Sequence, residues 1–150
     1  MKIVKKPDRI LRQELNKIEI LPDNIVEIVL AMQKTMVKAE GIGLAANQVN
    51  LNHQIFIIDE NLAKENNVPW VYINPQITNF SKEKALLEEG CLSIPGLYTE
   101  VPRSKKIMIK GIDQNGQKFK FKARGFLARV LQHEFDHLQG KLISDYVKKN

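Results

Sequence analysis

The sequence predicts an α+β fold in which antiparallel β-sheets surround a central helix that carries the motif H-E-x-x-H. Two observations support this fold class. Segments with strand character follow one another in runs instead of alternating with helices, and one strongly patterned helix follows them near the C-terminus. At 150 residues, with 43% hydrophobic and 27% charged content and no visible linker or repeat, the chain is expected to form a single domain over residues 1–150.

The first predicted helix opens after Leu21-Pro22, with Asp23 as its N-cap, and ends near Glu40 because Gly41 follows. One apolar face supports it, made of residues spaced as i, i+4, i+7 and i+11: Ile25, Val29, Met32 and Met36. The next segment, 41–49, begins Gly-Ile-Gly, which indicates either close approach of the backbone to a neighbour or a tight turn. A phosphate-binding loop is disfavoured there, because the segment lacks the third glycine of G-x-G-x-x-G and any Gly-Lys-Ser/Thr.

Several short segments rich in β-branched and aromatic residues are predicted to be strands. They are Ile55–Ile58, Trp70–Ile73 (ended by Asn74-Pro75), Tyr98–Val101, Lys106–Lys110 and Lys118–Ala123. A hairpin turn at 113–116, Asp-Gln-Asn-Gly, joins the last two strands, and a loop is expected over 79–84.

The second predicted helix lies between Gly125 and Gly140. One face carries Phe126, Val130, His133 and His137, and the opposite side is polar, with Arg129, Gln132, Asp136 and Gln139. Histidines four residues apart project from the same side of a helix and can hold one transition-metal ion, while Glu134 beside them can accept a proton from metal-bound water. The structural alternative is a pair of ordinary polar residues on an amphipathic helix. A third ligand would decide between the two interpretations.

Peptidases with H-E-x-x-H take this third ligand from downstream, but no glutamate follows His137, and Ile143 stands where the longer motif has its last histidine. The ligand must therefore lie upstream. Cys91, in a turn-rich and polar-flanked segment, is the best candidate and would complete a Cys-His-His set with one open position for water. His53 is the rival ligand.

Composition restricts the remaining function classes. No apolar run approaches the roughly 18 residues needed to span a bilayer, and the N-terminus lacks the apolar core of a signal peptide, so a cytoplasmic protein without membrane association is expected. The net charge of +6 suits either proximity to RNA-rich particles or a plain solvated surface, and it predicts no specific nucleic-acid binding. The only cysteine, Cys91, excludes an intrachain disulfide.

Three segments together resemble the bacterial-type peptide deformylase family: 41–48 (Gly-Ile-Gly-Leu-Ala-Ala-Asn-Gln), 89–93 (Glu-Gly-Cys-Leu-Ser) and 132–138 (Gln-His-Glu-Phe-Asp-His-Leu). They occur in the family's order, and Val101-Pro102-Arg103 agrees as well, so the resemblance covers essentially the whole chain. It implies an enzyme that removes the formyl group from the N-terminal formyl-methionine of nascent polypeptides and releases formate. A monomer is expected. Many family members continue into a C-terminal extension that some use for ribosome docking. This sequence stops at Asn150, so transient proximity to the ribosome is expected rather than direct docking.

The resemblance also implies residue roles. Cys91, His133 and His137 bind one divalent metal ion, with Fe(II) expected and Zn(II), Ni(II) or Co(II) as alternatives. Glu134 takes a proton from metal-bound water, the resulting hydroxide attacks the formyl carbon, and the Gln48 side-chain amide and Leu92 backbone N–H stabilise the oxyanion.

The substrate is expected to meet a methionine pocket and a strand-like backbone surface. The residues assigned to these are Ile42, Gly43, Leu44, Leu87, Gly96, Leu97, Tyr98, Phe126 and Val130. Ile42, Leu87, Phe126 and Val130, which are assigned to the methionine pocket, are equally credible as plain core residues. Two other functions remain open at this point: a metallopeptidase that cuts internal peptide bonds, and a basic RNA-binding module in which the metal is structural.

Overall fold

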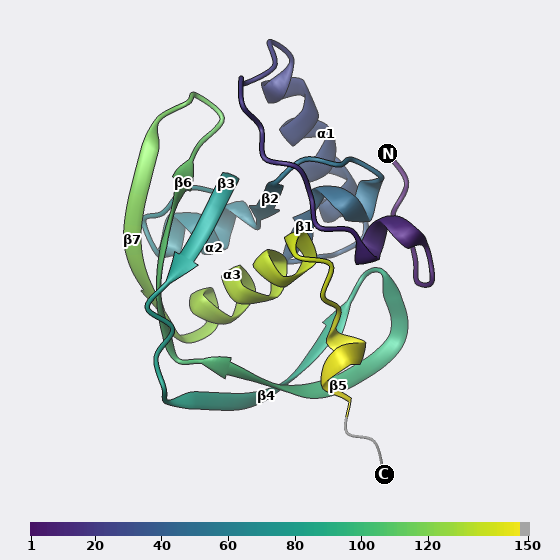
Figure 1. The fold of residues 1–150 in the computed structure, drawn as a ribbon, viewed down its shortest axis with the longest axis vertical. Coiled ribbons are helices and arrows are strands. Elements are labelled where there is room, and N and C mark those ends of the chain that lie inside the picture. The colour runs from purple at the N-terminus through teal and green to yellow at the C-terminus, as the bar shows by residue number, and fades with distance from the viewer. Residues whose placement is uncertain (148–150) are drawn as a thin grey trace.

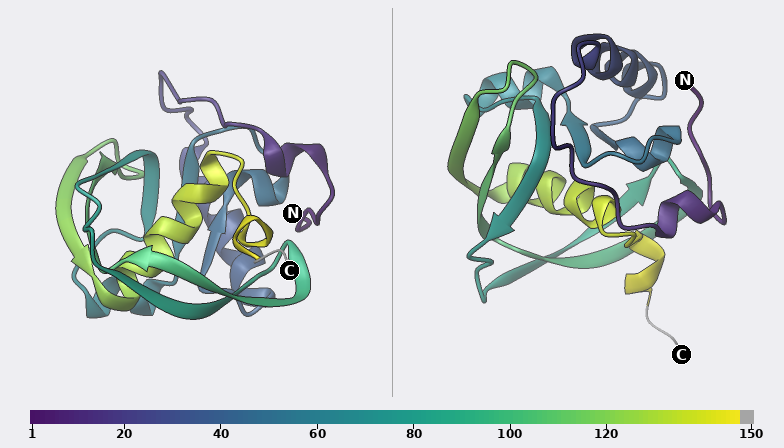
Figure 2. Two further views of the ribbon diagram at one scale, coloured as in Figure 1. Left: turned by 60° about the horizontal axis from the view of Figure 1, so that its bottom comes forward. Right: turned by 45° about the horizontal axis from the view of Figure 1, so that its top comes forward.

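The computed structural model describes residues 1–147 and places the H-E-x-x-H helix, α3 (Gly125–Leu138), at the centre of the molecule. A five-stranded sheet lies on one side of α3, and the two-stranded sheet β4–β5 crosses beneath it (Figures 1 and 2). The other elements are η1 (Arg9–Arg12), α1 (Ile25–Lys38), β1 (Gly43–Ala45), η2 (Ala46–Val49), β2 (Ile55–Ile58), α2 (Glu60–Glu65), β3 (Val71–Thr78), β4 (Lys84–Cys91), β5 (Ile94–Ser104), β6 (Lys106–Ile112), β7 (Lys118–Arg124) and η3 (Ile143–Tyr146). The predicted α+β class is confirmed. Within residues 1–147, no helix has the length and apolar character that crossing a membrane requires.

The larger sheet has the strand order β1-β2-β3-β6-β7, and every neighbouring pair is antiparallel. The predicted strand Ile55–Ile58 and the hairpin of β6 and β7 are confirmed. The predicted end of the third strand at Asn74-Pro75 is wrong, because β3 continues to Thr78. A register shift between Ile73 and Gln76 accommodates the proline, which cannot donate a ladder hydrogen bond.

The smaller sheet was only partly foreseen. Strand β4 was not predicted, and β5 is much longer than the expected Tyr98–Val101. β4 lacks the alternation of buried and exposed residues that marks a strand: consecutive Leu86 and Leu87 are both about half exposed. Cys91 is the last residue of this strand, not part of a turn-rich loop, and the turn Leu92–Ser93 follows it.

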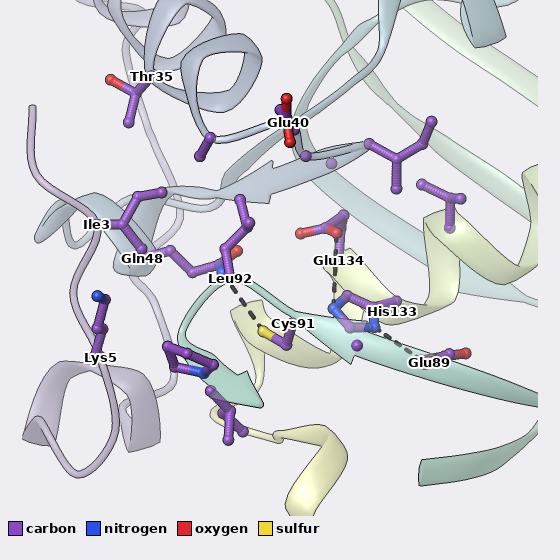
Figure 3. A pocket seen from close by; sticks show the side chains of 18 of the residues that line it. Ile3, Lys5, Thr35, Glu40, Gln48, Glu89, Cys91, Leu92, His133 and Glu134 are labelled. Atoms are coloured by element: carbon purple, nitrogen blue, oxygen red, sulfur yellow. Dashed lines mark hydrogen bonds and ion pairs between the residues drawn. The ribbon is translucent and has the colours of Figure 1, made fainter. Parts of the chain in front are cut away.

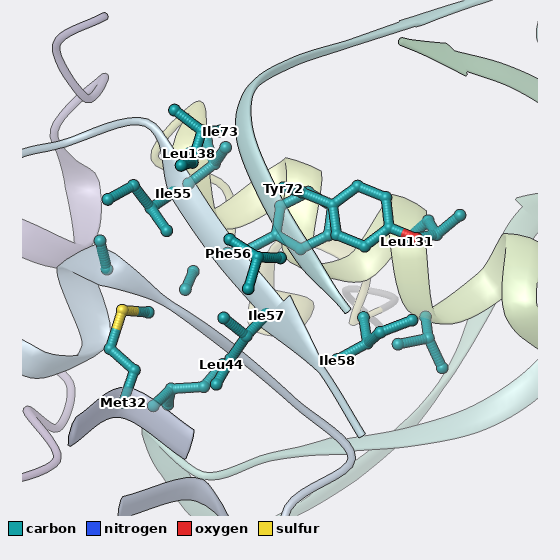
Figure 4. Close-up of a cluster of buried hydrophobic side chains, with 14 of the residues drawn as sticks. Met32, Leu44, Ile55, Phe56, Ile57, Ile58, Tyr72, Ile73, Leu131 and Leu138 are labelled. Atoms are coloured by element: carbon teal, nitrogen blue, oxygen red, sulfur yellow. The ribbon is translucent and has the colours of Figure 1, made fainter. Parts of the chain in front are cut away.

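The core lies between α3, α1 and the inner face of the five-stranded sheet (Figure 4). Phe56 and Tyr72 stack at its centre with ring centroids 4.8 Å apart, against Leu131 of α3. The predicted apolar face of α1, including Met32, is buried as expected. The cap differs from the prediction, because Asn24 rather than Asp23 precedes the first helical turn and makes no side-chain capping bond.

The side of α3 that was expected to be polar is not exposed to solvent. Arg129 and Gln132 are both nearly fully buried, since β5 covers this side of the helix. Gln132 satisfies its amide group there by donating to the Ser104 carbonyl (2.8 Å) and accepting from the Ser104 N–H (3.1 Å). Gly140, with φ +75°, follows the end of the helix as predicted. A central helix must therefore bury polar side chains, and Arg129 and Gln132 both find hydrogen-bond partners there.

Candidate metal centre and active site

Two elements bring together three groups that can bind a metal ion. His133 and His137 lie one turn apart on α3, and Cys91 at the end of β4 reaches them from the smaller sheet. One ligand atom from each residue lies within 4.8 Å of the others, and the Cys91 Sγ is 3.4 Å from the His137 Nε2. His53 is not part of this cluster. A thiolate with two imidazoles is a donor set suited to a transition metal.

The orientation of His133 is set by Glu89, a β4 residue to which the sequence analysis assigned no role. The His133 Nδ1 donates to the Glu89 Oε1 at 2.8 Å (Figure 3), which leaves Nε2 free to face Cys91. Burial raises the pKa of Glu89, but hydrogen bonds from His133 and Arg103 outweigh it and lower this pKa to about 2. Glu89 is therefore a fixed carboxylate that selects the ligating tautomer of His133.

Two buried arginines hold Glu89 in place. Arg103 donates to both of its oxygens, at 2.9 and 3.1 Å, and Arg129 donates to Oε2 and to two backbone carbonyls of β4 and β5. Arg103 also pairs with Asp136, which accepts a hydrogen bond from the Tyr146 hydroxyl at 2.7 Å. This network, Glu89-Arg103-Arg129-Asp136-Tyr146, is buried at Glu89 and both arginines and partly exposed at Asp136 and Tyr146, and it links α3, both strands of the smaller sheet and η3. Single-sequence patterns did not reveal it, although the quoted motifs contain three of its members, Glu89, Arg103 and Asp136.

The surroundings of the cluster favour a positive charge at its centre. Burial lowers the pKa of His133, yet Cys91, Glu134 and Glu89 together raise it to about 10. The neighbouring His137 keeps its neutral form, because burial and the nearby His133 depress its pKa. Among the described residues, the buried Glu134 Oε1 and His137 Nδ1 have no hydrogen-bond partner. A divalent cation bound by the three ligands fits this arrangement.

Glu134 stands beside the ligands and close to β1. Its Oε2 lies 3.9 Å from the His133 Nε2, and its side chain is almost fully buried. A Cβ added at Gly43 would come within 2.5 Å of Oε2, so the glycine is needed for close approach, as the Gly-Ile-Gly segment predicted. Burial raises the pKa of Glu134 to about 7, although the charge of His133 lowers it. A carboxyl group with such a pKa can accept and return a proton near neutral pH.

The two expected oxyanion donors lie at the same site. Gln48 of η2 is buried, accepts from the Ala45 N–H at 2.9 Å, and donates from Nε2 to the Ser93 hydroxyl at 3.1 Å. This Nε2 is 3.7 Å from the Cys91 Sγ, and Leu92 lies next to it (Figure 3). The preceding residue, Asn47, donates to the backbone carbonyl of His137 at 2.8 Å and so ties η2 to α3.

An open cleft of about 1340 Å³ leads to the cluster and contains most of the expected substrate residues. Those that line it are Ile42, Gly43, Gly96, Leu97, Tyr98, Phe126 and Val130. Leu44 does not line it, because its side chain is fully buried in the core. Leu87 is half exposed and also lies outside the lining of the cleft.

Comparison with known proteins agrees with this geometry. The family model of polypeptide deformylases matches residues 1–150. The chain is 40% identical over 147 residues to peptide deformylase 1 of Pseudomonas syringae pv. tomato, covering 98% of this chain and 86% of that one. It is 43% identical over 145 residues to the peptide deformylase of Azotobacter vinelandii, covering 97% and 85%.

Solved structures give the same result for the fold. The crystal structure of peptide deformylase from Thermotoga maritima superposes with a TM-score of 0.90 at 36% identity, covering 99% of this chain and 97% of that chain. A probable peptide deformylase from Synechococcus phage S-SSM7 has a TM-score of 0.89 at 40% identity, covering 97% and 99%. With the full-length match, these similarities show that the chain belongs to the polypeptide deformylase family.

Proposed function

We propose that Glu134, Gln48 and Leu92 carry the chemistry of the family's reaction in this chain. That reaction removes the N-formyl group from the N-terminal formyl-methionine of nascent polypeptides and releases formate. The observation that carries the proposal is the Glu134 carboxylate, which is buried, holds a free oxygen and stands beside the Cys-His-His cluster at an open cleft.

Cys91, His133 and His137 are the proposed ligands of one divalent metal ion. When bound, such an ion acts as a Lewis acid that polarises the formyl carbonyl and lowers the pKa of water. Fe(II) is the proposed physiological ion, with Zn(II), Ni(II) or Co(II) as alternatives. The thiolate makes the site sensitive to oxidation, because a solvent-accessible thiolate is the first target of oxidants.

The protein groups supply proton transfer and charge stabilisation. Glu134 accepts a proton from the water that attacks the formyl carbon, and it returns this proton to the amine nitrogen as the C–N bond breaks. The Gln48 Nε2 and the Leu92 backbone N–H donate to the oxygen that becomes negatively charged. Each such donor is worth about 10²–10³ in rate in comparable sites. The products are formate and a peptide with a free N-terminal methionine.

Substrate recognition is proposed to use both side chains and backbone of the cleft. The apolar side chains of Ile42, Phe126 and Val130 provide the pocket for the methionine side chain. The backbone at Gly43 and at 96–98 offers edges on which the substrate can add as a strand. Because the chain belongs to the deformylase family, we no longer propose a metallopeptidase that cuts internal peptide bonds or an RNA-binding module with a structural metal.

The test is formate release from a formyl-Met dipeptide by anaerobically purified, metal-loaded protein. Turnover should follow the bound metal in the wild type. Glu134→Gln keeps the size of the side chain but cannot accept a proton, so we expect unchanged metal content and a kcat reduced by about 10³-fold or more. Near-normal turnover in this variant would disprove the role of Glu134, and no turnover by the metal-loaded wild type would disprove the function.

A further inference from the structure

The N-terminal segment of the chain, Met1–Lys6, lies across the two parts of the site that carry the oxyanion donors. The Val4 N–H donates to the carbonyl of Gln48 at 2.7 Å. Two residues later, the Lys6 N–H donates to the carbonyl of Ser93, the residue after Leu92, at 2.9 Å. We call this segment the N-terminal strap; Figure 3 shows its residue Ile3 beside Gln48.

These contacts close a ring of hydrogen bonds. One side is the bond from the Gln48 Nε2 to the Ser93 hydroxyl, at 3.1 Å. The other sides are the two backbone bonds from Val4 and Lys6 of the strap. Each donor-bearing segment is thus held to the other directly and also through the strap.

We infer that the N-terminal strap is a positioning element that fixes Gln48 and the Leu92–Ser93 turn in the arrangement needed to stabilise the oxyanion. This inference rests on the proposed function, since it concerns the donors of that reaction. Strap residues touch the donor segments through backbone groups, so their role is to position these segments and not to take part in the chemistry.

The turn needs such support because of where it lies. Leu92 and Ser93 connect the strands of a two-stranded sheet, and a sheet of this size is marginally stable by itself. A register shift between Gly90 and Cys91 further interrupts the strand pairing just before the turn. Misplacement of a donor by about 1 Å can lower the rate about 10²-fold, so even a small movement of the Leu92–Ser93 turn would slow the reaction.

The strap and the residues that follow it are anchored to the C-terminal part of the chain. Arg12 makes two hydrogen bonds to Asp145 of η3, at 2.8 and 2.9 Å, and the Lys6 Nζ donates to the Ser144 hydroxyl at 3.1 Å. Leu15 adds a backbone bond to the carbonyl of Leu138 at the end of α3. The chain that continues from the strap is therefore tied to the end of the helix that bears both histidine ligands.

Proline substitution tests the inference, because proline removes the backbone N–H that makes each bond. Two pairs are compared: Val4→Pro with Val4→Ala, and Lys6→Pro with Lys6→Ala. The alanine variants lose the side chain but keep the N–H, and both Lys6 variants equally lose the exposed Nζ bond to Ser144, so only the backbone N–H differs within that pair. For each variant, kcat and KM for a formyl-Met dipeptide, metal content and thermal unfolding are measured in metal-loaded protein.

We expect each proline variant to lower kcat by about tenfold, less than the loss of a complete donor, with KM changed less than about twofold and metal content unchanged. The alanine variants should stay within about twofold of wild type in kcat. A proline variant that is folded, metal-loaded and as active as its alanine partner would overturn the inference. Failure of both proline variants to fold would also overturn it, since the strap would then serve global stability. An inactive wild type would instead count against the proposed function.

Discussion

Replacement of Gly43 by alanine should separate metal binding from proton transfer. The new Cβ would lie 2.5 Å from the Glu134 Oε2 and 2.9 Å from its Cγ and Cδ. Gly43 has no left-handed backbone conformation, so the substitution adds no backbone strain, and the nearest atoms it meets are those of Glu134. Neither partner can yield easily, because β1 is paired with β2 and Glu134 is buried on α3.

The size of the effect follows from the distances. An ordinary contact needs at least 3.4 Å, so the carboxylate must retreat by about 0.9 Å from its position at 2.5 Å. A misplacement of about 1 Å at a reacting group costs about 10²-fold in rate, which corresponds to about 2.7 kcal/mol in activation free energy. The three atoms nearest to the new methyl group all belong to Glu134 and none to the metal ligands, so we expect metal content not to change.

The assay is steady-state formate release, with metal content measured on the same preparation. Glu134→Asp supplies a matched background, because its carboxylate is one methylene shorter and leaves room for the methyl group. Gly43→Ala should therefore cost much less in that background than in the wild type, and the two effects should not add. A Gly43→Ala enzyme that is fully metal-loaded and keeps a kcat within about threefold of wild type would refute the reasoning.

Three further outcomes are expected. Cys91→Ala should fold but lose bound metal and formate release together. Chelation of the wild type should stop formate release and leave its circular dichroism spectrum unchanged. Formate release by metal-loaded Cys91→Ala would exclude the thiolate as a ligand. Arg129→Met should lower the free energy of unfolding in urea by about 3 kcal/mol, because Glu89 and two backbone carbonyls lose a buried donor, and a loss below about 1 kcal/mol would contradict this. Tyr146→Phe removes the hydroxyl that donates to Asp136 and should cost about 1.5 kcal/mol by the same measurement, and an unchanged stability would show that this hydrogen bond contributes nothing.

Local patterns in the sequence were sufficient for the elements whose geometry is itself local. The histidines of α3 share a face because four residues make about one helical turn, and no other part of the chain is needed to place them. The strand Ile55–Ile58 follows from its short β-branched and aromatic run, and the β6–β7 hairpin follows from alternation and turn chemistry. The family motifs added the expected roles of Gln48 and Leu92.

The tertiary structure decided the features that depend on contacts between segments far apart in the sequence. Strand β4 could not be recognised because its sheet buries little on either face, so its residues show no alternation. Arg129 and Gln132 look like surface residues of an amphipathic helix, and only the position of β5 over α3 buries them. The same contacts create the Glu89 network, which depends on charges that are far apart in the chain.

The metal centre shows most clearly which features the sequence determines and which the tertiary structure determines. The sequence by itself determined which residue types could bind an ion, because the helical spacing of the histidines and the lack of a downstream ligand pointed to Cys91. Only the tertiary structure brought Cys91 to 3.4 Å from His137 across 46 positions of sequence, put Glu89 behind His133, and laid the N-terminal strap against both donor segments. The physical reason is that periodicity reports the shape of one element, whereas a site is made where several elements pack together.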